Sequence, residues 1–163
     1  RRQRQMCIRD SASVDCWLEQ ATRPRSRNVH EVSSMSTTAH ELVERARARL
    51  EAVPPQQAFE ELSSGKAVAL DVREAAEGEE HSEGAVQGPR GLLEVAADPT
   101  SARQHNALDP GARVIVYCRS GTRAALAALT LQTLGFAHVA NLEGGFVAWK
   151  EAGLPWIEHH ADL

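Results

Sequence analysis

Two short apolar runs constrain the fold of this chain more than any other feature of its sequence. They are AVALDV at 67–72 and ARVIVYC at 112–118. Neither run alternates regularly with polar residues, which is typical of strands that are buried on both faces. Shorter extended pieces are predicted at 85–87 and within 137–145. Such strands occur in parallel sheets whose two faces are covered by helices.

Segments with helical spacing of apolar residues separate these runs. The clearest segment is 122–134, and a longer amphipathic one over 37–53 is expected to begin at a cap near Thr37 or Thr38. Alternating helices and strands predict an α/β fold in which ligands bind at the carboxyl ends of the strands. The predicted helices cover 37–53, 54–65, 92–98, 122–134 and 146–153.

Composition and charge exclude several classes of protein. The chain has 163 residues, of which 42% are hydrophobic and 25% charged, as expected for one globular domain. Residues 1–34 hold seven arginines and four acidic residues, whereas 35–163 hold 11 basic and 18 acidic residues. An acidic body argues against nucleic acid as a partner. Without an apolar run of membrane-spanning length or a signal-peptide core, we expect a cytoplasmic protein with no membrane partner.

The first 34 residues are interpreted as foreign to the domain. The opening RRQRQMCIRDS looks like the in-frame translation of a transposase adapter used in DNA library preparation. The rest of 1–34 shows neither helical nor strand periodicity, so we expect a non-native or disordered segment. The alternative is a basic arm that binds nucleic acid. We expect translation to start at Met35 and 35–163 to form a single domain.

The last of the three cysteines carries the candidate chemistry. Cys118 ends the second apolar run and is followed by RSGTR and a helix, whereas the other two cysteines lie at 7 and 16, so no disulfide framework is predicted. A helix N-terminus and nearby arginines favour the reactive thiolate. Backbone N–H groups of the turn are expected to face the sulfur. Gly121 permits a positive φ there, and Arg119 and Arg123 can neutralise an anionic substrate.

A buried structural cysteine is the alternative interpretation, since free cysteine is among the most buried residue types. The polar and cationic segment that follows Cys118 argues against it. Ser120 and Thr122 are candidate substrate contacts, and both could also cap the helix.

Five stretches of the chain together resemble the rhodanese family of sulfurtransferases over about 45–157. The resemblance implies a rhodanese-like fold, with a small five-stranded parallel sheet and helices on both faces. It also places Arg73 in the substrate pocket, although a strand-end salt bridge to Asp71 explains the same residues equally well. The stretches are ALDVRE at 69–74, HSEGAVQGPRG at 81–91, ADP at 97–99, VIVYCRSGTRAALAALTLQTLGF at 114–136 and VANLEGGFVAWKEAGLP at 139–155.

The resemblance also implies a mechanism. Cys118 attacks the sulfane sulfur of thiosulfate or of a persulfide donor, and a cysteine persulfide remains. A thiol or cyanide then accepts the sulfur, and the scheme needs no metal and no organic cofactor. The catalytic residue is Cys118, and the residues implied in substrate binding are Arg119, Ser120, Gly121, Thr122, Arg123 and Arg73.

Two other functions stay open. One is a persulfide carrier or regulatory module that acts on a protein partner. The other is a cysteine-dependent phosphatase or arsenate reductase. Those families have a similar anion-binding loop, but five residues separate its cysteine from its arginine, whereas four residues separate Cys118 from Arg123 here.

One segment departs from the family. Members commonly show Gly-His-Ile-Pro-Gly-Ala where this chain has EHSEGA at 80–85, so Ser82 and Glu83 replace Ile and Pro. We expect the packing of this segment to differ. Phe146 and Trp149 are predicted to belong to the core.

Overall fold

The computed structural model describes residues 37–77 and 79–158, which belong to one compact unit. The interpretation of residues 1–34 and the expected start at Met35 lie outside the described residues. Within them, five strands form one parallel sheet in the order β1-β6-β5-β2-β4. Its strands are β1 (Glu51–Val53), β2 (Val68–Asp71), β4 (Val86–Gln87), β5 (Arg113–Tyr117) and β6 (His138–Leu142).

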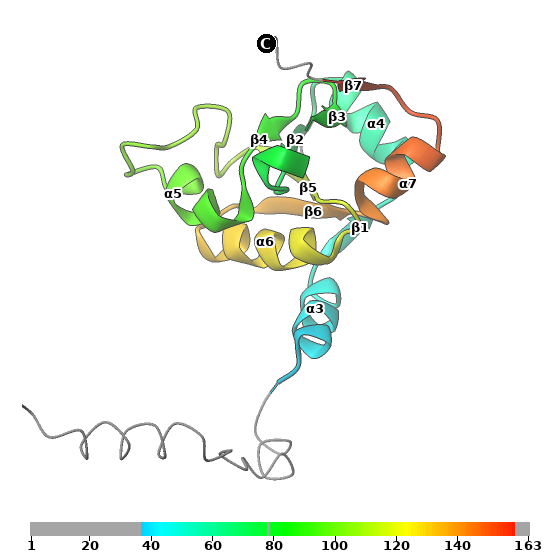
Figure 1. Cartoon of the computed structure of the whole chain (residues 1–163). Helices are drawn as coiled ribbons and strands as arrows, with labels where there is room; N and C mark the ends of the chain where they lie inside the picture. The colour runs from blue at the N-terminus through cyan, green and yellow to red at the C-terminus, as the bar shows by residue number, and fades with distance from the viewer. Residues whose placement is uncertain (1–36, 78, 159–163) are drawn as a thin grey trace, which may run out of the picture. The chain divides into compact units, whose positions relative to one another are not determined.

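Helices cover both faces of this sheet, as predicted (Figure 1). One face packs against α5 and α6, and the other packs against α4 and α7. None of the helices in the described ranges is long and apolar enough to cross a bilayer. The helices are α3 (Ala39–Arg47), α4 (Pro55–Ser63), α5 (Leu93–Ala97), α6 (Thr122–Thr133) and α7 (Gly145–Glu151), with 3-10 turns η1 (Ala75–Glu77) and η2 (Arg90–Leu92).

The central strand β5 divides its side chains between two cores. Val114 and Val116 pack on the side of α5 and α6, whereas Ile115 and Tyr117 pack on the side of α4 and α7. Successive residues of a strand point to opposite faces, so a continuous apolar run fills both layers at once. β5 pairs in parallel with β2 and β6 on either side of it.

The predicted helix over 37–53 is wrong in its second half. A capping box between Thr38 and Glu41 starts α3 as expected, but the helix ends at Arg47 and β1 begins at Glu51. The strand pairs in parallel with β6, for instance Val53 with Leu142. Pairing with β6 satisfies the hydrogen-bonding capacity of the backbone at 51–53, so this segment forms a strand although its sequence pattern predicts the end of a helix.

A second small sheet was not predicted at all. It consists of β3 (Glu80–Ser82) and β7 (Trp156–Glu158), which pair in antiparallel fashion. Three-residue strands show too little alternation to be recognised from a sequence. The pairing ties the end of the described chain to the acidic segment that follows β2.

The packing of α6 on the sheet generates a stability prediction. Leu131 is fully buried in the core on that face. Leu131→Ala should lower the free energy of unfolding by about 2–5 kcal/mol because it removes apolar contacts and leaves a cavity. Urea denaturation measures the change. The control Leu92→Ala removes a side chain that is 57% exposed, and its effect should stay within about 0.5 kcal/mol. Equal losses in both variants would contradict this packing.

Candidate active site

Cys118 directly follows the central strand β5, at the carboxyl edge of the parallel sheet. Its side chain is 1% exposed and contacts the core on the α6 side, as the structural-cysteine interpretation expects. The loop that follows differs from a core segment, because Arg119, Ser120 and Thr122 are exposed. The structure therefore sets a sheltered thiol beneath a polar surface turn.

The predicted loop residues come together in one turn that leads into α6. Gly121 is the N-cap of α6 and has φ 84°, the left-handed conformation that glycine adopts readily. No side-chain hydrogen bond caps this helix, and the hydroxyls of Ser120 and Thr122 lie 3.4 Å from each other. Helix capping is therefore not the role of Ser120 or Thr122.

The backbone amides of this turn are available to a ligand. The backbone N–H groups of residues 119–124 donate no hydrogen bond to any other residue that the structure describes. The first N–H groups of a helix have no partner within it, and consecutive free amides in a turn attract anions. These six N–H groups follow immediately after the thiol and can stabilise a negative charge on it or on its adduct.

Helix α7 holds the loop from outside. The amide N of Phe146 donates to the carbonyl O of Cys118 at 2.8 Å, and the amide N of Val147 donates to the carbonyl O of Arg119 at 3.1 Å. Gly145 lies so close that a Cβ there would be 2.5 Å from the Cys118 carbonyl O. Sequence reasoning did not assign this role to the glycine pair at 144–145, although the pair belongs to the motif that resembles the family.

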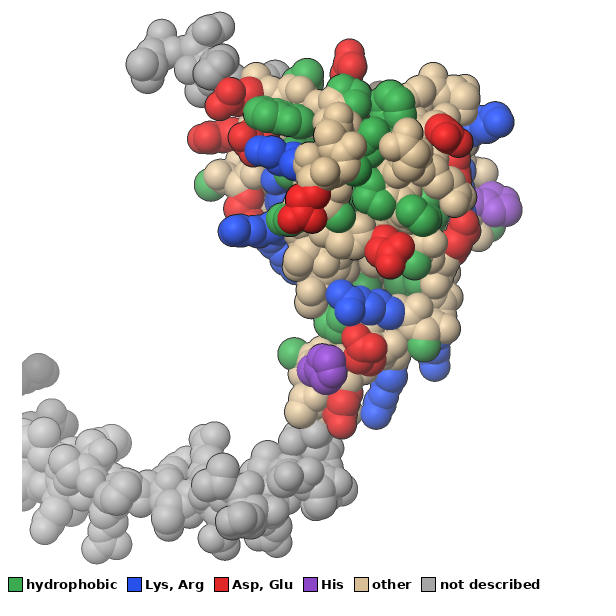
Figure 2. Space-filling model, turned by 90° about the vertical axis from the view of Figure 1, so that its right-hand side faces the viewer, with side chains coloured by type: hydrophobic (Ala, Val, Ile, Leu, Met, Phe, Trp, Pro, Cys, Tyr) green, Lys and Arg blue, Asp and Glu red, His purple; other side chains and the backbone are tan. Residues whose placement is uncertain are grey.

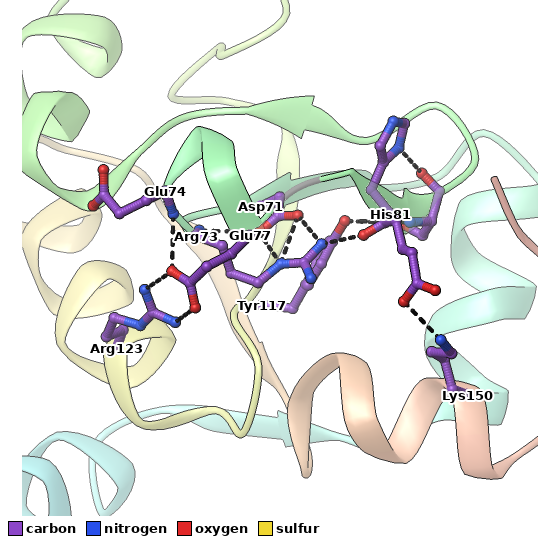
Figure 3. Close-up of polar contacts among 10 residues, drawn as sticks. Asp71, Arg73, Glu74, Glu77, His81, Tyr117, Arg123 and Lys150 are labelled. Carbon is purple, nitrogen blue, oxygen red and sulfur yellow. Dashed lines mark hydrogen bonds and ion pairs between the residues drawn. The ribbon is translucent and has the colours of Figure 1, made fainter. Parts of the chain in front are cut away.

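Arg123 is already paired with a carboxylate. Its Nη1 and Nη2 atoms donate to Glu77 at 2.6 and 2.7 Å, as the two dashed lines between them show (Figure 3). Hydrogen bonds from Arg123 lower the pKa of Glu77 to about 2, helped by the Glu74 amide. The same pair raises the pKa of Arg123, to which Cys118 adds a smaller effect. Sequence analysis did not identify Glu77, one of several acidic residues in its segment.

Arg73 forms the strand-end ion pair that sequence analysis left as an alternative. Its Nη2 donates to Oδ2 of Asp71 at 2.6 Å, and both side chains are almost fully buried. The guanidinium also lies 4.5 Å from the ring centroid of Phe146. Arg73 is therefore held in place by the Asp71 carboxylate and the Phe146 ring. It also lines a groove beside the loop.

A groove of about 350 Å³ opens beside the loop. Lys150 of α7 lines the groove and pairs with Glu80 at 2.7 Å. Phe146 and Trp149 are buried, as predicted, and Phe146 forms part of the groove wall. No cluster of potential metal ligands occurs in the described ranges. The groove is lined by Arg73, Glu77, Glu80, Arg119, Phe146, Val147 and Lys150.

The departure at Ser82 is accommodated by Tyr117. Ser82 is buried in β3, and its amide N and hydroxyl both lie 3.3 Å from the Tyr117 hydroxyl. Burial raises the pKa of Tyr117 above its usual range. A polar contact thus occupies the place where the family commonly has an isoleucine, while Glu83 is exposed.

Residues 54–152 match the family of rhodanese-like domains, and the chain belongs to this family. Among curated proteins, a sulfurtransferase of Allochromatium vinosum is 48% identical over 44 residues, which cover 27% of this chain and 41% of the relative. Two further relatives are covered over 27% and 25% of their length. The chain thus spans well under two thirds of these relatives.

Solved structures show the same fold. A Rhodopseudomonas palustris protein of unknown function, named a possible tyrosine phosphatase, has a TM-score of 0.69 at 31% identity. That match covers 75% of this chain and 96% of the other. Thiosulfate sulfurtransferase from Pseudomonas aeruginosa has a TM-score of 0.60 at 28% identity, over 75% of this chain and 23% of the other. These matches agree with the predicted rhodanese-like architecture.

The contact between α7 and the loop generates a prediction. Gly145→Ala should slow the sulfur uptake that the sequence leads us to expect of Cys118 at least about tenfold, because the Cβ meets the Cys118 carbonyl and the residue has φ 63°. Uptake is measured by mass spectrometry after a timed exposure to a sulfur donor.

The matched control is Gly91→Ala, since an added Cβ meets nothing within 4 Å there and no positive φ is involved. The control should react like the parent chain. If Gly145→Ala folds and reacts at the parental rate, α7 does not set the loop geometry.

Proposed function

We propose that this domain is a sulfurtransferase that carries sulfane sulfur on Cys118. The observation that supports the proposal best is the row of unbonded amides at 119–124, which begins directly after a thiol at the carboxyl end of β5. Membership of the rhodanese-like family agrees with this chemistry. A thiol that is sheltered from solvent but adjacent to a polar turn suits a reactive intermediate that must not be lost to water.

The reaction has two displacements. The Cys118 thiolate forms a bond to the outer sulfur of the donor, the donor's S–S bond breaks, and the bonding pair leaves with sulfite when thiosulfate is the donor. The persulfide keeps one negative charge on its terminal sulfur. A thiol or cyanide then attacks that sulfur, and the pair of the Cys118 S–S bond returns to the thiolate.

The loop stabilises the charged intermediate. N–H groups of Ser120, Gly121 and Thr122 are preorganised donors that need no rearrangement when the persulfide forms. The N-terminus of α6 adds a positive partial charge, because the peptide dipoles of its 12 residues are aligned along the helix axis. Arg119 and Arg73 line the groove beside the loop, whereas the charge of Arg123 is balanced by Glu77.

The proposed substrates are a small anionic sulfur donor such as thiosulfate and a thiol or cyanide acceptor, with no metal or organic cofactor. The names of the Allochromatium and Pseudomonas proteins support sulfur transfer in general. We also propose that the domain acts in the cytoplasm, without a nucleic acid or membrane partner.

Mass spectrometry tests the intermediate directly. Treatment with thiosulfate, or separately with a small-molecule persulfide, should add one sulfur atom to Cys118. Cyanide should remove that atom as thiocyanate. Cys118→Ser should gain none at residue 118, because serine cannot form a persulfide. Absence of the adduct with both donors in the intact chain would contradict the proposed function.

A carrier module is a second candidate within the same chemistry. The exposed Val147, next to Arg119 in the groove wall, gives an acceptor protein an apolar contact beside the loop. Steady-state turnover with cyanide, compared with single transfer to a protein thiol, separates a carrier from an enzyme. A carrier should load Cys118 normally and turn over small acceptors poorly.

Phosphatase activity is a third candidate, because a similar structure is named a possible tyrosine phosphatase. Four residues between Cys118 and Arg123 form a smaller ring than the five of cysteine phosphatases. We expect no hydrolysis of p-nitrophenyl phosphate until one residue is inserted into the loop. Hydrolysis by the unaltered chain that is lost in Cys118→Ser would favour the phosphatase.

A further inference from the structure

The carboxylate of Glu77 occupies the guanidinium N–H groups of Arg123 that would otherwise bind an anionic substrate. A guanidinium presents paired N–H groups that match the oxygens of a carboxylate or a sulfonate. Both terminal nitrogens of Arg123 are engaged by the two oxygens of Glu77, at 2.6 and 2.7 Å. Figure 3 shows Glu77 reaching from η1 to the start of α6. An incoming sulfonate group must displace Glu77 or bind without this arginine.

The other cations beside the loop are compensated in the same way. Arg73 pairs with Asp71 and Lys150 pairs with Glu80. Of the cations that line the groove, Arg119 is the one for which the described ranges provide no carboxylate partner. Figure 2 shows basic and acidic side chains next to each other over the described face of the domain, without a broad area of one sign. The groove therefore offers little net positive charge to a dianion.

We propose that Glu77 is a specificity-determining residue that acts as an internal anion on Arg123, slows sulfur uptake from the dianion thiosulfate and favours sulfane-sulfur donors of lower charge. The inference rests on the proposed sulfurtransferase function and adds a preference among donors. Persulfides and thiosulfonates belong to the favoured class, because they carry at most one charge at the reacting end. The transfer step itself is unchanged, since each donor loses its outer sulfur to Cys118.

Charge arithmetic gives the proposal a measurable signature. Removing one unit of negative charge several ångströms from the donor should speed the reaction about threefold for each negative charge on the donor. A dianion therefore gains about tenfold and a monoanion about threefold. Thiosulfate and the methanethiosulfonate anion form a suitable pair, because both give up a sulfane sulfur and differ by one charge. Their leaving groups are sulfite and methanesulfinate.

The experiment uses the full chain with Glu77→Gln, which keeps the shape of the side chain and removes its charge. The rate constant for sulfur addition to Cys118 is measured with each donor. We expect about tenfold and about threefold increases, so that the ratio of thiosulfate to methanethiosulfonate rates rises about threefold. Added salt should shrink the difference between Glu77→Gln and the parent chain, because these groups are exposed to solvent.

The matched control is Glu94→Gln. Glu94 forms a comparable exposed ion pair with Arg90 at 2.8 Å, but it lies on α5 and does not line the groove. The control should leave both rates unchanged. Glu77→Ala, which removes the carboxylate and its hydrogen bonds, should raise the ratio in the same direction as Glu77→Gln and guards against an effect peculiar to glutamine.

The effect should not depend on pH near neutrality. Hydrogen bonds from Arg123 and from the Glu74 amide lower the pKa of Glu77 to about 2 from its ordinary 4.5, so the carboxylate stays charged as the solution is acidified to well below neutral pH. The rate ratio between Glu77→Gln and the parent chain should thus be constant between about pH 5 and about pH 8.

The outcomes separate the two proposals. If neither donor modifies Cys118 in any variant, the proposed function fails and this inference fails with it. If both donors modify Cys118 but the donor ratio is the same in Glu77→Gln and the parent chain, only the inference fails. A fall of both rates in Glu77→Gln would also overturn the inference, because Glu77 would then serve to position Arg123.

Discussion

The hydrogen bond from the Phe146 amide to the Cys118 carbonyl is the contact on which the candidate site depends. Together with the bond from Val147 to Arg119, it turns two carbonyl groups of the loop toward α7. The backbone N–H groups of residues 119–124 remain available to donate hydrogen bonds to an anion at the sulfur. Two adjacent glycines at 144–145, both with positive φ, are needed to bring α7 this close. Strand β5, the loop and α7 thus form one unit, in which α7 fixes the geometry of the loop and Cys118 is the proposed reactive residue.

Charge around this unit is balanced rather than accumulated. A site that concentrates positive charge attracts every anion in solution, including phosphate and sulfate. Pairing Arg123 with Glu77, and Lys150 with Glu80, removes that general attraction. The backbone amides remain, and their directionality favours an anion held at the sulfur itself. In the proposed function, selectivity then arises from the position of the charge, since a negative sulfur attached to Cys118 would lie at the amides.

The sequence predicted the parts of the structure that local patterns determine. Strands β2 and β5 and helix α6 are long enough for their apolar spacing to be recognised, and the loop residues of the site are consecutive, so they were found together. β1, β3 and β7 were missed because each has three residues and is stabilised by partners far along the chain. The pairing of Glu77 with Arg123 was missed for a related reason: 46 residues separate them, and the segment of Glu77 holds several equivalent carboxylates.

Tyr117 and Cys118 are neighbours in the chain but belong to the cores on opposite faces of the sheet. Repacking either interior layer would therefore shift the thiol, so natural variation that preserves activity should be restricted in both. Glu77 and Arg119, which line the groove, are exposed and take no part in either core. The proposed preference for one sulfur donor over another can accordingly diverge between related proteins by single exchanges at the groove, while the scaffold that holds Cys118 stays the same.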